Sequence, residues 1–216
     1  VWNLRTNTTD PVGSKGSGFL VTPGDYSVSV SLVKDGIVEL LVDKQAFTVK
    51  GLNNQTLLTK NPEDLKAFRA EISELNRKVS GTEKVMGETK ESIELIEKAL
   101  LNYPNTDLTF LKSIREMMVS LKDLEVLMWG DKAKSSREFE TVPSISGRLG
   151  MVAYQIYQNT AGVTKTHRSN KQIAEKQYNA LRSELNEIIG ELNAIESKLE
   201  GIIPYTKNKG ANWKKD

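Results

Sequence analysis

The chain has few side chains suited to chemistry, and no known catalytic motif arranges them. It contains one histidine, His167, and no cysteine. The histidine lies in the polar stretch Lys165–Asn170, for which we expect an exposed loop just before the last helix. A lone exposed histidine lacks the further ligands of a metal site and the partner nucleophile of a catalytic base. The absence of cysteine excludes disulfides, thiolate metal ligands and cysteine nucleophiles.

Acidic side chains are numerous, but their spacing indicates a solvated helix surface. They stand off the apolar positions and interleave with lysines, as exposed helical ion pairs do. The clearest runs are Glu88, Glu91, Glu94 and Glu97, and Glu184, Glu187 and Glu191. A di-iron helix bundle requires inward-pointing Glu-x-x-His pairs, and the sequence contains none. We therefore predict no metal, no other cofactor and no catalytic residue in this chain.

Aromatic residues provide the best candidates for a ligand or partner surface. The candidates are Trp129, Tyr154, Tyr157, Tyr205 and Trp213. Exposed rings of this kind stack on sugars and on peptide side chains. In the alternative interpretation, Trp129 and Tyr154 pack among the helices and the tail with Tyr205 and Trp213 folds back across them. The sequence pattern leaves both interpretations open.

The elements that would position these residues fall into two parts with different hydrophobic periods. Before about residue 58, Tyr26, Val28, Val30 and Leu32 alternate with polar residues, which is typical of a half-buried antiparallel strand. Asp35-Gly36 predicts a hairpin turn after it. We expect four or five strands, with others at 1–5, 37–42 and 45–50. Residues 1–58 are thus predicted to form a small immunoglobulin-like β-sandwich domain.

This predicted β-domain is short for its class. A closed sandwich of this kind takes about seven strands in about 100 residues. The chain also opens at Val1 on residues that already resemble a strand. We therefore expect further strands upstream, in a longer protein.

After residue 58 the apolar residues recur at intervals of three and four, which predicts long amphipathic helices. The predicted inner-face stretches are 65–100, 108–128, 145–156 and 178–202. Asn61 and Asp107 are predicted to cap the first two helices, and the fourth is expected to begin near Ser169. Gly81 and Gly87 predict a bend or break near residues 80–88. Residues 59–216 are therefore predicted to form an antiparallel four-helix bundle with a C-terminal tail, which makes the chain α+β.

The composition is that of an ordinary folded domain. Charged residues make up 27% of the chain and hydrophobic residues 38%, and the formal net charge is +2. This balance provides no polybasic block for nucleic acid or an anionic membrane. No apolar run approaches the length of about 18 residues needed to span a bilayer. We therefore predict neither nucleic-acid binding nor membrane insertion.

Three stretches together resemble a bacterial protein family. They are Val1 to Arg5 (VWNLR), Thr22 to Val28 (TPGDYSV) with the strand ending at Lys50, and the helix and tail from Leu181 to Trp213. Their order resembles the C-terminal region of BNR-repeat glycosyl hydrolases and sortilin-like β-propeller proteins. The first two stretches also resemble the FlgD-type immunoglobulin-like module.

The resemblance implies an exported protein, either periplasmic, cell-surface or secreted, with a β-propeller upstream that carries any substrate site. None of the propeller's Asp-box repeats is present, so no hydrolase residue can be assigned in this chain. The leading hypothesis is a non-catalytic C-terminal accessory or interaction module whose partner is that propeller. The alternatives are a carbohydrate-binding accessory domain that uses the exposed aromatics, and a structural module that self-associates.

Overall fold

The structure is a computed structural model that describes residues 2–7, 18–52, 61–103, 107–158 and 161–199. Two strands precede the helices, which confirms the predicted α+β class. The strands are β1 (Gly24–Lys34) and β2 (Ile37–Val49). The helices are α1 (Pro62–Asn102), α2 (Leu108–Trp129), α3 (Lys132–Ser135), α4 (Ile145–Gln158) and α5 (Lys165–Leu199).

The two strands form one antiparallel hairpin, with the predicted turn at Asp35-Gly36. Both turn residues have positive φ, 50° and 79°, as a tight hairpin turn of matching twist requires. β2 is a single strand of 13 residues where we expected two. β1 pairs with β2 along its length because two register shifts, between Val28 and Ser31 of β1, accommodate the extra residues of β2. Within the described residues the sheet has these two strands, and a single bridge joins Arg5 to Leu20.

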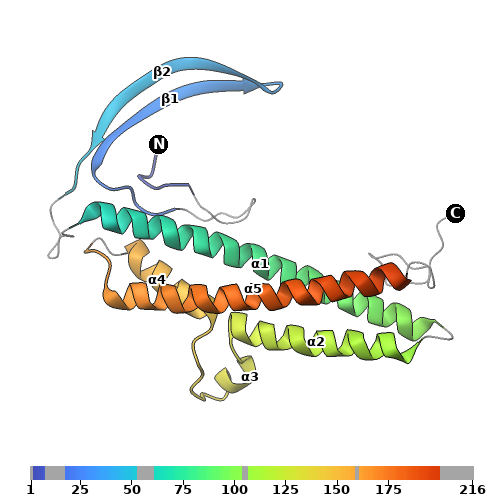
Figure 1. Ribbon diagram of the computed structural model, residues 1–216. Helices are drawn as coiled ribbons and strands as arrows, with labels where there is room; N and C mark the ends of the chain where they lie inside the picture. The colour runs from blue at the N-terminus through green and yellow to red at the C-terminus, as the bar shows by residue number, and fades with distance from the viewer. Residues whose placement is uncertain (1, 8–17, 53–60, 104–106, 159–160, 200–216) are drawn as a thin grey trace.

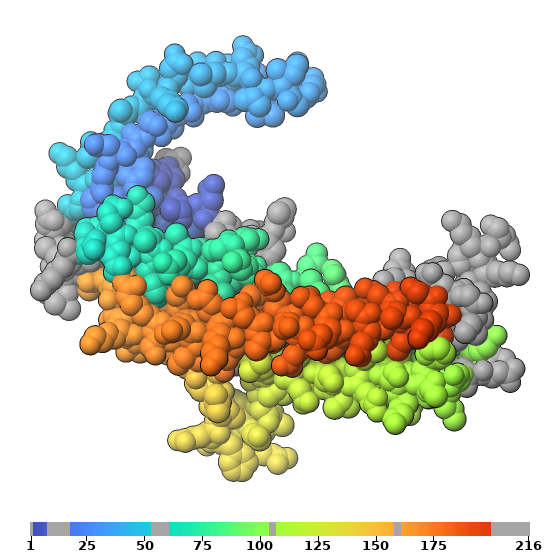
Figure 2. Space-filling model, viewed as in Figure 1, coloured from blue at the N-terminus to red at the C-terminus, as the bar shows by residue number. Residues whose placement is uncertain are grey.

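The hairpin is a curved arm that stands away from the helices (Figures 1 and 2). Apart from Tyr26 and Val49, every residue of both strands is exposed. The expectation that one face of β1 is buried is therefore wrong for the described residues, because no second layer among them covers the arm. The four or five predicted strands and the closed sandwich are likewise not present there.

Long helices make up the rest of the described chain. α1 and α5 run in the same direction, and α2 and α4 run the opposite way, with α4 continuing past the end of α2 (Figure 1). The shorter pair therefore lies one after the other along α1 and α5, whereas we expected four helices side by side. The reason is that α4 has only 14 residues and follows an excursion that contains α3.

The helix ends behave largely as predicted, but the middle of α1 does not. The side chain of Asn61 accepts a hydrogen bond from the Asp64 amide at 3.1 Å, and that of Asp107 accepts one from Thr109 at 2.9 Å. α1 is one continuous helix of 41 residues, so of the bend or break predicted near residues 80–88 the break does not occur. Tertiary packing of its apolar face outweighs the low helix propensity of glycine.

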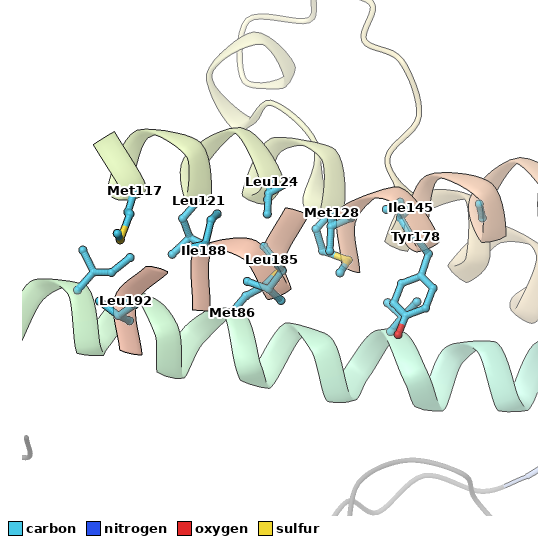
Figure 3. Close-up of a cluster of buried hydrophobic side chains, with 14 of the residues drawn as sticks. Met86, Met117, Leu121, Leu124, Met128, Ile145, Tyr178, Leu185, Ile188 and Leu192 are labelled. Carbon is cyan, nitrogen blue, oxygen red and sulfur yellow. The ribbon is translucent and has the colours of Figure 1, made fainter. Parts of the chain in front are cut away.

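The helices share one apolar core along the predicted inner faces. In Figure 3, Leu121 of α2 lies next to Ile188 of α5, and Leu124 lies near Leu185. Leu121 and Leu185 are 0% and 2% exposed, so the core excludes water. Burial of such side chains stabilises the fold by roughly 25 cal/mol per Å². Leu108, which was expected inside, is instead 74% exposed.

Candidate docking surface on the hairpin arm

The two faces of β1 differ in chemistry. One face of β1 carries Tyr26, Val28, Val30 and Leu32, and the other carries the serines between them. Cross-strand pairing adds Phe47, opposite Tyr26, and Val42, opposite Val30, to the first face. It also places the polar residues Gln45 and Glu39 there, opposite Val28 and Leu32. We call the apolar members of this set the apolar face: Tyr26, Val28, Val30, Leu32, Val42 and Phe47.

The apolar face lies on the concave side of the arm. The indole ring of Trp2 packs against Tyr26 and Phe47, with ring centroids 5.8 Å and 5.9 Å apart. The N-terminal segment that contains Trp2 lies inside the curve of the hairpin (Figure 1). Trp2 thus covers the base of the apolar face.

Beyond Trp2 the apolar face is open to solvent. Val28, Val30 and Leu32 are 53%, 48% and 46% exposed. A contiguous apolar patch on a soluble protein marks an interaction site, because exposing it to water is unfavourable. A lone two-stranded hairpin is moreover only marginally stable in water. The arm therefore exposes apolar area that the described residues do not cover.

Arg69 of α1 fixes the base of the arm to the helices. Its Nη1 donates a hydrogen bond to the Leu20 carbonyl at 2.9 Å, and its Nε and Nη2 donate to the Ile156 carbonyl at 3.3 Å and 3.1 Å. Burial, and to a lesser extent the positive charge of Arg5, lowers the pKa of this guanidinium. One side chain thus joins α1, the end of α4 and the segment that leads into β1.

Aromatic and cationic groups reinforce this attachment. The Arg5 guanidinium lies 4.1 Å from the ring centroid of Tyr157 on α4. Phe19 packs near the same ring at 6.1 Å, and Arg69 lies 5.6 Å from the Phe19 ring. The N-terminal segment is therefore anchored at its contact with the helices, while the arm above it stays uncovered.

The structure separates the aromatic residues that the sequence singled out. Trp129 Nε1 and Ser146 Oγ donate hydrogen bonds to the same oxygen of Glu83, at 2.9 Å and 2.8 Å. Ser146 and Tyr157 are eleven positions apart on α4, or about 16 Å along the helix. Trp129 and Tyr157 therefore do not share one patch.

The structure describes one of the other three aromatic candidates, Tyr154, which is on the same helix as Tyr157. Tyr154 is 69% exposed, so the interpretation that packed it among the helices is wrong. Trp129 is also 39% exposed despite its bond to Glu83. Tyr205 and Trp213 lie outside the described residues.

His167 is buried in the first turn of α5, which corrects the expectation of an exposed loop. Its backbone amide donates a hydrogen bond to Thr164 Oγ1, and the Thr164 amide donates one to His167 Nδ1, both at 3.2 Å. This reciprocal pair has the spacing of a capping box, with histidine in the place of Glu or Gln. The helix therefore begins at Lys165, four residues earlier than predicted. The Thr-x-x-His spacing was the signal that the sequence reasoning overlooked.

We predict that the stability of the fold decreases in mild acid through His167. Nδ1 must stay unprotonated to accept its bond, and Nε2 then donates to Gln155 Oε1 at 3.0 Å. Burial lowers the pKa of His167 below its usual value of about 6.5. The stabilisation that neutral His167 provides is present above pH ~6.5 and is lost as the pH falls through its lowered pKa. Urea unfolding at neutral and mildly acidic pH should show a loss of about 1 kcal/mol, the usual contribution of a helix cap.

The His167→Gln variant is the control for this prediction. Glutamine keeps a capping-box residue at the third helical position and does not titrate. Its unfolding midpoint should therefore change less between the two pH values. An equal acid loss in the wild type and in this variant would contradict the role of His167.

The described residues do not contain a candidate metal-binding site. Across the described ranges, no group of three or more histidine, cysteine, aspartate and glutamate side chains is placed to hold a metal ion. None of the helices described combines the length and apolar character that a bilayer crossing requires.

Comparisons of the chain with protein-family models, curated proteins and solved structures find no match.

Proposed function

We propose that the chain is a non-catalytic accessory module that uses the hairpin arm to dock onto a neighbouring β-domain of a larger exported protein. The apolar face of the arm carries this proposal. Its side chains alternate regularly and are apolar, yet Val28, Val30 and Leu32 are about half exposed in the described chain. The resemblance to the C-terminal regions of β-propeller proteins supports the same assignment.

The partner proposed for the apolar face is another β-sheet. A sheet face of alternating apolar residues packs on a second sheet about 10 Å away. The hairpin then supplies two strands of an immunoglobulin-like sandwich, and the polypeptide that precedes Val1 supplies the others. Trp2 lies at the base of this face, so any segment joined to it is present at high effective concentration.

In this proposal the helices form a bundle that serves as a rigid support and does not carry out a reaction. The buried core packs α1, α2, α4 and α5 into one unit. The hydrogen bonds of Arg69 to the Leu20 and Ile156 carbonyls connect this unit to the base of the arm. Any hydrolysis belongs to the propeller implied by the resemblance. Incubation of this chain with chromogenic glycosides should give blank rates, and turnover that copurifies with the chain would contradict the proposal.

The hydrophobic dye bis-ANS tests whether the apolar face is a covered surface. The chain alone should bind the dye, and a Val28→Ser, Val30→Ser double variant should bind less, because it removes exposed apolar area. Ser29→Ala on the opposite face is the matched control and should behave like the wild type. When the polypeptide preceding Val1 in its natural protein is attached, the signal should fall.

Unchanged dye binding in the longer polypeptide would contradict docking to that neighbour. Pairing with a second copy is the competing outcome. In that case light scattering would give twice the 24.1 kDa mass of the chain.

A further inference from the structure

A cavity of about 640 Å³ lies at the base of the arm. The extended segment 19–26 forms one side, and the first three turns of α1 form the other. The size is typical of cavities that bind small ligands or anchor side chains, which range over about 300–1,000 Å³. No role described above uses this cavity.

The cavity wall on the β1 side is largely apolar, whereas the α1 wall is mostly polar and charged. The wall residues from the segment before β1 and from its start include Phe19, Leu20, Val21, Pro23 and Tyr26. Ala70 lies on the opposite wall and contributes only a methyl group from α1, which leaves room between the two sides. The apolar wall favours a group that loses little hydration when it enters.

The charged residues at the cavity already have partners. Glu63 pairs with Lys66 at 3.6 Å, and Glu74 pairs with Arg77 at 2.7 Å. The Arg69 guanidinium donates to two carbonyls, as described above, and Asp25 accepts a hydrogen bond from Thr48. A charged ligand would compete with these contacts, whereas a neutral ligand would not. The cavity therefore favours a neutral group.

We propose that this cavity is a binding site for a neutral apolar group of aromatic size, supplied as a side chain by the polypeptide that covers the apolar face. Tyr26 links the two surfaces, because its ring belongs to the apolar face and also lines the cavity. A buried aromatic anchor next to a flatter contact is the usual arrangement of a strong interface. The nature of the site follows from its walls, and the source of the group rests on the proposed function.

Disulfide exchange tests the chemistry of the site in the chain alone. The protein has no cysteine, so Ala70→Cys introduces a single thiol at the cavity wall. Ala67→Cys is the matched control, because Ala67 is exposed on the same helix, as Ala70 is, and does not line the cavity. Each thiol is joined in turn to 2-phenylethanethiol, cysteamine and 3-mercaptopropionate, and the 2-mercaptoethanol concentration that releases half of the adduct is measured.

The neutral aromatic adduct of the Ala70→Cys variant should resist release by at least about tenfold relative to the control, which corresponds to about 1.4 kcal/mol. The cationic and anionic adducts should differ little between the two variants. Equal release of all three adducts from both variants would overturn the assignment of the cavity as an apolar binding site.

The reaction of the same thiols with iodoacetamide tests the source of the group. In the longer polypeptide, the Ala70→Cys thiol should react at least about tenfold more slowly than in the chain alone, while the Ala67→Cys thiol keeps its rate. Selective retention of the aromatic adduct without this protection would overturn the source and leave the chemistry of the site intact. Dye binding reports separately on the covering of the apolar face, so its failure is distinguishable from failure of the cavity proposal.

Discussion

Replacement of Leu185 by aspartate is expected to unfold the helical part of the protein. Leu185 is 2% exposed and lies between α1 and α2, near Met86 and Leu124 (Figure 3). Loss of a buried leucine costs about 2–5 kcal/mol, and burial of an unpaired carboxylate adds several more. The sum is comparable to the whole stability of a typical domain, about 5–15 kcal/mol. Far-ultraviolet circular dichroism should show loss of most of the helical signal.

Asn186→Asp is the matched control for this variant. It introduces the same charge at the next position, which is exposed. A surface change of this kind normally alters the free energy of unfolding by less than about 0.5 kcal/mol. A Leu185→Asp protein that keeps its helical signal and its urea midpoint would contradict the core described here.

Replacement of Arg69 by methionine is expected to destabilise the protein by about 3 kcal/mol. The change leaves the carbonyls of Leu20 and Ile156 without the donors that the guanidinium supplies, and each loss costs about 1–3 kcal/mol when the group stays buried. It also breaks the connection between the helices and the base of the arm. Urea unfolding gives the loss of stability, and faster amide exchange around Leu20 and Val21 would report the loosened base.

Arg77→Met provides the comparison on the same helix. Arg77 forms an exposed ion pair with Glu74 at 2.7 Å, and such pairs contribute at most about 1 kcal/mol. The two variants remove the same charge and add the same side chain. Equal effects from both would contradict the structural role of Arg69.

The sequence predicted the helices well because their stability comes from a repeating apolar face. Residues such as Ile72, Ile93 and Leu185 were assigned to the inner face from their spacing alone, and they are buried. The prediction was wrong where spacing alone does not decide the outcome, both within a helix and at the start of α5. Met117 is buried where Met118 was expected, and the cap at Thr164 moves the start of α5.

The connection between the two parts of the chain was not predictable from local patterns. Arg69 immediately follows the core residue Phe68, and its carbonyl partners are 49 and 87 positions away in the sequence. No short motif encodes such a contact. The alternation in β1 did predict a strand with one apolar face, but a strand pattern does not specify what covers that face.

The proposed docking uses an arm whose orientation is fixed at its base. Its base is held by Arg69 and by the contact of Arg5 with Tyr157, so the orientation of the arm is set by the helices. Its length is exposed, so the apolar face is accessible for the proposed docking. A pre-oriented surface of this kind loses less conformational entropy on docking than a flexible one.

Amide hydrogen exchange along the hairpin tests the docking of the arm most directly. In the chain alone, the amides of β1 and β2 should exchange much faster than those of α1 and α5, because a lone hairpin is marginally stable. In the polypeptide that also carries the residues preceding Val1, exchange in the hairpin should slow by about a hundredfold or more while the helices change little. Equally fast exchange of the hairpin in both proteins would contradict docking onto a preceding β-domain.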